Sequence, residues 1–166
     1  LLDPAMGSGH ILVYAFEVFY EIYEKCGYPE RDIPRLILEN NLYGLDIDDR
    51  AYQLAAFALV MKAASYSKRF LRSVEREGLT LHVASIQETN HVSDDVIAYI
   101  AQQEKGDRYD EVKAFFDQYH NAKTYGSLIN ITQRDTTFLE QRLTHIANNP
   151  VDDLFYGEQH DIAAQV

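Results

Sequence analysis

The chain contains one cysteine and no tryptophan, and it has no long hydrophobic run. A lone Cys26 can form neither an internal disulfide nor a cysteine-based zinc site, which excludes both frameworks. No apolar stretch approaches the roughly 18 residues that a membrane-spanning helix requires, and no signal peptide is recognisable. These absences favour a cytoplasmic protein that is held together by an ordinary hydrophobic core.

Positive charge is also scarce. The 15 Lys and Arg residues are outnumbered by 26 Asp and Glu residues, which gives a formal net charge of −11. Such a surface does not attract DNA phosphates or an anionic membrane. We therefore expect any contact with double-stranded DNA to come from parts of a larger protein outside this chain. The sequence begins without methionine, inside what reads as a strand, and this also indicates an excerpt.

The most informative stretch lies at the beginning of the chain. Leu1 and Leu2 read as the end of a buried strand, and an apolar helical pattern starts at Ile11. Between them lies a turn that carries Gly7 and Gly9. A strand, a glycine loop and a helix in this order open a Rossmann-like unit. Glycine accepts positive φ and lets a ligand approach the backbone, although Gly-x-Gly by itself is equally typical of a simple tight turn.

The residues around the two glycines make the pattern more specific. The loop reads Asp3-Pro4-Ala5-Met6-Gly7-Ser8-Gly9. It resembles the first motif of S-adenosylmethionine-dependent adenine-N6 DNA methyltransferases, Asp-Pro-Ala-Cys-Gly-Ser-Gly, with Met6 in place of the cysteine. The resemblance implies that residues 3–9 bind S-adenosyl-L-methionine. A P-loop is excluded because no Gly-Lys-Ser/Thr follows, and Leu12 stands where a dinucleotide-binding loop has its third glycine.

A second strand is predicted over residues 42–48, and it ends in acidic residues. In nucleotide-binding folds a carboxylate at the tip of the second strand accepts hydrogen bonds from the ribose hydroxyls, and Asp46 has this position. Ile47 would then offer an apolar surface to the adenine ring. The alternative is that Asp46 and Asp48 merely begin the next helix. Residues 41–48 also resemble the second motif of the same methyltransferases.

The next helix is predicted over residues 51–64. This stretch is rich in alanine and apolar on most sides, which is typical of a helix buried between layers. Together with the acidic strand before it, the run resembles the large adenine methyltransferases of phage-exclusion (BREX-type) systems and of type II restriction enzymes with fused methylase domains.

A third strand is predicted over residues 79–85 from its alternation and β-branched content. Many members of the family carry an acid near its end that reaches the adenine amino group of the cofactor. Here Ser85 and Ile86 stand in that place, so the resemblance assigns them to the adenine with a weaker contact. His82, inside the strand, is interpreted as a packing residue and not as a catalyst.

A basic cluster follows the long helix, from Lys68 to Arg72 with Arg76 beyond it. Because its surroundings are acidic, a solvated helix end is favoured over a phosphate-binding patch.

The remaining residues predict mainly helices. Residues 93–103, 109–119 and 136–148 have helical patterns, and 128–131 reads as a short strand or a loop. Asn149-Pro150, followed by residues 151–153, is interpreted as a turn. Residues 149–152 are not assigned a catalytic role, because they lack the second proline and the aromatic residue of the Asn/Asp-Pro-Pro-Tyr/Phe motif with which the family holds the flipped adenine. We therefore predict a cofactor-binding core over 1–90 and a helical insert or extension over 91–166.

The predicted fold is α/β, a Rossmann-like methyltransferase core with a partial parallel sheet and a helical insertion. The predicted function is that of the S-adenosyl-L-methionine-binding part of a DNA adenine-N6 methyltransferase from a restriction-modification or phage-exclusion system. No catalytic or metal-binding residue is assigned, and the chain by itself is expected to be inactive. Two alternatives stay open: a methyltransferase of the same fold that acts on RNA or protein, and a non-catalytic helical interaction module.

Overall fold

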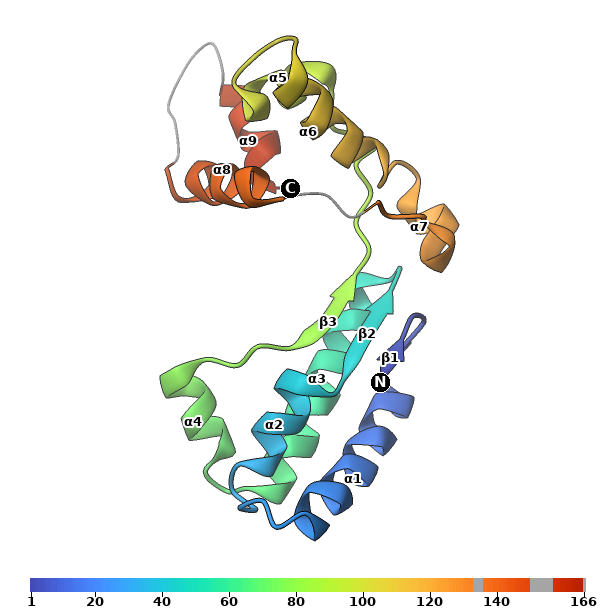
Figure 1. Ribbon diagram of the computed structural model, residues 1–166, viewed down its shortest axis with the longest axis vertical. Helices are drawn as coiled ribbons and strands as arrows, with labels where there is room; N and C mark the ends of the chain where they lie inside the picture. The colour runs from blue at the N-terminus through green and yellow to red at the C-terminus, as the bar shows by residue number, and fades with distance from the viewer. Residues whose placement is uncertain (133–135, 150–156, 166) are drawn as a thin grey trace. The chain divides into compact units, whose positions relative to one another are not determined.

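The computed structural model describes residues 1–132, 136–149 and 157–165 (Figure 1). It divides the chain into two compact units, Leu1–Ile86 and Gln87–Val166. Each unit is described by itself. None of the helices in the described ranges is both long and apolar enough to cross a membrane.

The first unit is built on a small parallel sheet. Its strands lie in the order β1 (Leu2–Asp3), β2 (Tyr43–Asp46) and β3 (His82–Ser85). The connections between them are helical, which is the usual way to join parallel strands. They consist of α1 (His10–Lys25), α2 (Ile33–Asn40), α3 (Asp49–Tyr66) and α4 (Phe70–Glu77). The predicted α/β class with a partial parallel sheet is confirmed.

One face of the sheet carries the core of this unit. Asp3, Gly44 and Val83 are register partners and therefore point to the same side. Helices α1, α2 and α3 pack against one another, and their inner residues build the core (Figure 1). The largest fully buried side chains here are Phe16, Leu12, Ile33, Ile37, Leu38, Leu42 and Leu59.

The other face of the sheet is open to solvent within the described residues. Leu2, Tyr43 and His82 are register partners on it, and Leu2 is 60% exposed. The prediction that Leu1 and Leu2 end a buried strand is wrong in this respect. Both crossovers step in the same direction along the sheet, and right-handed connections then place their helices on the same face. His82 packs, as predicted: its ring stacks on Tyr43, and its Nε2 lies 2.8 Å from the carbonyl oxygen of Glu39.

Helix α3 is less enclosed than its composition predicts. Its inner side is fully buried at Ala55, Leu59 and Ala63. Its outer side exposes Leu54, Phe57 and Met61, so the expected burial between two layers is wrong for this face. The reason is that the described part of the first unit supplies neighbours for α3 only from the sheet, α1, α2 and α4.

The second unit is helical. Its elements are α5 (Asp94–Ala101), α6 (Asp107–Asp117), α7 (Ala122–Tyr125), a 3₁₀ turn (Gly126–Leu128), α8 (Thr137–Asn148) and α9 (Gly157–Gln165). Ser93 caps α5, since its hydroxyl accepts from the Val96 N–H. Residues 129–131 form no strand, which settles that alternative in favour of a loop. The predicted turn at Asn149 continues into residues 150–152, which lie outside the described residues.

Gly44 provides a test of the core. A Cβ added at this position would collide with Met6 Sδ and come within 2.8 Å of Leu12 Cδ1. Gly44→Ala is therefore expected to lower the free energy of unfolding by about 2 kcal/mol through overpacking, as measured by urea denaturation. Gly157→Ala is the control, because a Cβ there meets nothing within 4 Å. Equal stability of the two variants would contradict this account of the core.

Candidate cofactor site at the carboxyl edge of the sheet

The glycine loop connects β1 to α1 and is fixed by backbone hydrogen bonds. The Met6 N–H donates to the Leu45 carbonyl oxygen at 2.9 Å, and the Gly9 N–H donates to the Met6 carbonyl oxygen at 2.9 Å. Gly7 and Gly9 have φ angles of +54° and +81°, in the region that favours glycine. Gly9 also lies so close to α3 that an added Cβ would come within 3.0 Å of Ala55 Cβ. The two glycines thus serve the turn and its packing on a neighbouring helix.

Asp46 lies at the tip of β2 and reaches the loop. Its Oδ2 accepts from the Gly7 N–H at 2.8 Å, and its Oδ1 accepts from the N–H groups of Ile47 and Asp48 at 2.8 and 3.0 Å. These backbone donors, with Asp48 the largest contributor, hold the pKa of the Asp46 carboxyl below its ordinary value of 3.8, against the opposing effect of burial. Asp46 is therefore a fixed anion, hydrogen-bonded to a residue 39 positions earlier in the chain.

Asp46, the last residue of β2, and Asp48, two residues beyond it, make different hydrogen bonds. Asp48 caps α3, because its Oδ1 accepts from the Arg50 N–H at 2.8 Å. Asp46 does not take part in this cap. The helix-start alternative is thus correct for Asp48, whereas Asp46 faces the loop.

Asp3 ends β1 and is nearly buried. Its Oδ1 accepts from the Ala5 N–H at 3.2 Å, whereas its Oδ2 is buried and has no hydrogen-bond partner among the described residues. A buried carboxylate oxygen without a donor is costly, and such an atom is often completed by a ligand. Around it, Pro4 and Ala5 are exposed and Ser8 is partly exposed. The Met6 side chain packs in the core, so only its backbone can face a ligand.

The end of β3 lies beside Asp46. Ser85 is the register partner of Asp46, and the Ile86 N–H donates to the Asp46 carbonyl oxygen at 2.8 Å. Ile47 follows Asp46 with its side chain 46% exposed. The structure thus brings the loop, Asp46, Ser85 and Ile86 to one edge of the sheet. Their roles toward a cofactor stay predictions.

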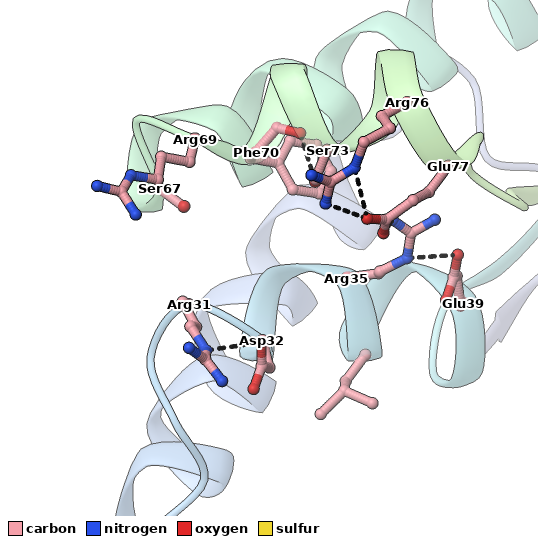
Figure 2. Close-up of a pocket in the computed structure, with 11 residues that line it drawn as sticks. Arg31, Asp32, Arg35, Glu39, Ser67, Arg69, Phe70, Ser73, Arg76 and Glu77 are labelled. Carbon is pink, nitrogen blue, oxygen red and sulfur yellow. Dashed lines mark hydrogen bonds and ion pairs between the residues drawn. The ribbon is translucent and has the colours of Figure 1, made fainter.

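Part of the basic cluster, Arg69 and Arg76, lines a pocket of about 400 Å³ between α2 and α4 (Figure 2). Lys68, Arg69, Arg72 and Arg76 are exposed, as expected of a solvated helix end, and only Phe70 is buried.

Arg35 links the two helices that form this pocket. It pairs with Glu39 of α2 and Glu77 of α4 at 3.1 and 3.3 Å, and it also donates to the Gly78 carbonyl oxygen. The Arg76 guanidinium beside Glu77 keeps the pKa of that carboxyl below its ordinary value. Because carboxylates engage these arginines, the pocket is a structural link between two helices.

Comparison with known proteins gives the family. The model of the family "N-6 DNA Methylase" matches residues 1–150, which is most of the chain. The chain belongs to the N-6 DNA methylase family. The resemblance drawn from the loop and from residues 41–48 is confirmed by this match.

Three relatives are informative. The adenine-specific methyltransferase BrxX of Escherichia coli O9:H4 (strain HS) is 38% identical over 166 residues, covering 88% of this chain and 13% of the relative. The adenine-specific methyltransferase PglX of Lacticaseibacillus casei (strain Zhang) is 53% identical over 68 residues, 41% of this chain and 6% of the relative. A putative type II restriction enzyme and methyltransferase of Methanocaldococcus jannaschii is 43% identical over 65 residues, 36% of this chain and 6% of the relative. The chain therefore spans only about an eighth of the length of BrxX.

Two features of the site were missed from the sequence. One is the hydrogen bond from the Gly7 N–H to Asp46, and the other is the unpartnered Oδ2 of Asp3. Composition and spacing gave no signal for either, because both depend on how the loop backbone turns. An acid at the end of each of the first two parallel strands was the available hint, since parallel strands end at one edge.

The packing of Gly9 on α3 can be separated from its φ angle. Gly9 and Gly27 both have a φ of +81°, but a Cβ at Gly27 meets nothing within 4 Å. Gly27→Ala is expected to cost about 1 kcal/mol for the left-handed backbone alone. Gly9→Ala is expected to cost about 1–2 kcal/mol more through the contact with Ala55. Chemical denaturation of both variants measures the difference, and equal losses would show that the close approach to α3 is unimportant.

The lowered pKa of Asp46 predicts how the free energy of unfolding depends on pH. A carboxyl whose pKa is lowered by folding contributes stability above its unfolded pKa, near 3.8, and loses it as the pH falls through the lower folded value. At pH 7, Asp46→Asn is expected to lower the free energy of unfolding by about 1–3 kcal/mol, since its amide mismatches backbone donors. The deficit relative to wild type should shrink below pH 3.8. Exposed Glu75→Gln is the control, with an expected change under about 0.5 kcal/mol throughout. A deficit that is independent of pH would refute the assigned hydrogen bonds.

Proposed function

We propose that residues 1–86 form the S-adenosyl-L-methionine-binding part of a DNA adenine-N6 methyltransferase. The observation that carries the proposal is the hydrogen bond from the Gly7 N–H to Asp46 Oδ2 at 2.8 Å. It joins the loop that resembles the first family motif to the acid that resembles the second. A nucleoside with an amino-acid tail needs both groups side by side, and the family match supports this use of them.

The residues present fit such a cofactor. A carboxylate offers about four acceptor positions, and three backbone N–H groups occupy three of them on Asp46. One position on Oδ2 is left for a ribose hydroxyl. A Cβ at Gly7 would meet no protein atom within 4 Å, so the space beside this backbone is open to a ligand.

Other residues at the same edge of the sheet would contact the remaining parts of the cofactor. Asp3 Oδ2 lacks a donor, and the ammonium group of the methionine portion would supply one. The exposed Ile47 side chain would cover one face of the adenine ring, with Ser85 and Ile86 beside it. Asp3 and Asp46 are anions next to a cofactor that carries positive charge, which favours its binding.

When bound, the cofactor supplies an activated methyl group for transfer to an amino nitrogen. The residues of this chain bind and orient it: Asp46 fixes the ribose, and the loop fixes the methionine portion. Orientation is itself a large part of catalysis, because a positioned donor no longer has to be encountered by diffusion. The groups that hold the adenine of DNA are proposed to lie elsewhere in the full-length protein, as is the surface that binds double-stranded DNA.

Methylation of RNA or protein and a non-catalytic interaction module are the competing functions. Two relatives are named as adenine-specific methyltransferases, and the third as a putative restriction enzyme and methyltransferase, which favours DNA. The fixed carboxylate at the loop favours a ligand site over a bare interaction module.

The cofactor site is tested by titrating the full-length protein with S-adenosylhomocysteine in a calorimeter. Asp46→Ala is expected to weaken binding by about 10- to 100-fold, the loss of one or two hydrogen bonds to a charged group. Gly7→Ala is expected to weaken it similarly, because its Cβ occupies the space beside the loop. Gly27→Ala has the same kind of backbone change away from the loop and should bind normally. No binding by the wild type, or binding indifferent to Asp46→Ala, would refute the site.

The substrate class is tested separately. The full-length protein is incubated with labelled cofactor and equal amounts of DNA, RNA or protein, and nucleosides from the digested nucleic acids are separated. Label in N6-methyladenosine from RNA, or in protein, would replace the DNA proposal without affecting the cofactor site.

A further inference from the structure

A groove lies between α1 and α3, which pack side by side in the first unit. It encloses about 510 Å³. Its walls are mostly apolar, with Val13 from α1 and Leu54, Ala58 and Met61 from α3. Polar groups stand at its rim, where Lys62 pairs with Glu17 across the two helices. The groove also borders Ser8 and His10 at the end of the glycine loop.

The outer side of α3 extends this apolar surface. Leu54, Phe57 and Met61 recur at intervals of three and four residues and so form one stripe. All three are exposed, and Phe57 is 63% exposed. The opposite side of α3 is the buried one, so the helix is apolar on two sides. A helix that is apolar all round belongs inside a protein, with partners on both sides.

The shape and chemistry of the groove fit a third helix. Two neighbouring helices leave a furrow into which the side chains of another helix can pack. The apolar walls, with only Lys62 and His10 as basic groups beside Glu17, do not suit a nucleic acid backbone. An amphipathic helix with apolar residues at spacings of three, four and seven would fill it.

The length of a relative and the size of the apolar surface indicate which polypeptide supplies this helix. The matched stretch is 13% of BrxX, so proteins of this kind have most of their chain outside these elements. Each side of a stable dimer interface contributes about 20–30 residues, whereas the apolar residues of this surface are Val13, Leu54, Phe57, Ala58 and Met61. A segment of the same polypeptide docks on such a strip without the entropy loss of bringing two molecules together.

We propose that, in the full-length methyltransferase, an amphipathic helix from outside residues 1–166 of the same polypeptide docks in the groove between α1 and α3. It covers Leu54, Phe57 and Met61. This inference concerns the outer side of the helices and does not depend on the cofactor proposal.

The test uses the full-length protein with the photo-cross-linking amino acid p-benzoylphenylalanine at position 57, and at position 71 as the matched control. Leu71 lies on α4 and is 50% exposed, so it is apolar and exposed like Phe57 but remote from the groove. The protein is irradiated, cross-linked monomer is separated from cross-linked oligomers by denaturing electrophoresis, both are digested, and cross-linked peptides are identified by mass spectrometry. The expected result is a cross-link from position 57 to one segment outside residues 1–166, with none to that segment from position 71.

Each other result would overturn the proposal. Cross-links confined to residues 1–166, cross-links found only between chains, equal cross-linking at both positions, or none at position 57 would all mean that no such helix docks there. A second measurement uses Phe57→Asp in the full-length protein. It should lower the melting temperature by about 5 °C or more if the groove is covered, and Leu71→Asp by about 1 °C or less. Equal shifts would also count against the covered groove.

Discussion

The hydrogen bond between the Gly7 N–H and Asp46 Oδ2 is the constraint on which the arrangement of this chain depends. It joins two residues that are 39 positions apart and connects the first strand-to-helix turn to the tip of the second strand. Because Asp46 also accepts from the two residues that follow it, its carboxylate cannot rotate away without leaving several donors unpaired. The edge of the sheet is thereby set before any ligand is present, which is the condition for binding without a large ordering cost.

The hydrophobic core packs directly against the loop at this edge of the sheet. Met6 lies in the loop, but its side chain is buried and packs against Gly44 of β2, in space that a larger residue at position 44 would fill. A soft, unbranched thioether fills such irregular space well. The motif position that usually carries cysteine is therefore used here for packing, while the neighbouring backbone atoms stay at the surface. One residue thus connects the hydrophobic core to the candidate site.

Much of the first unit could be predicted from the sequence, because its signals are local. The turn at Gly7 and Gly9, the helix that starts at His10, the cap at Asp48 and the acid at Asp46 all follow from residue type and spacing. The sequence did not reveal which sides of the elements would be covered. Leu2 and Phe57 look like core residues, yet both are exposed, since burial depends on neighbours that no local pattern specifies. In the second unit, α9 was missed because its short stretch has a weak amphipathic pattern.

Helix α3 has a consequence for how distant parts of the protein influence one another. It begins three residues after Asp46 and continues for 18 residues, a length of about 27 Å. A helix of this length behaves as a stiff rod, anchored at its first turn by Asp48 and along its inner side by fully buried residues. The helix is thus one continuous element between an exposed apolar side and the tip of β2.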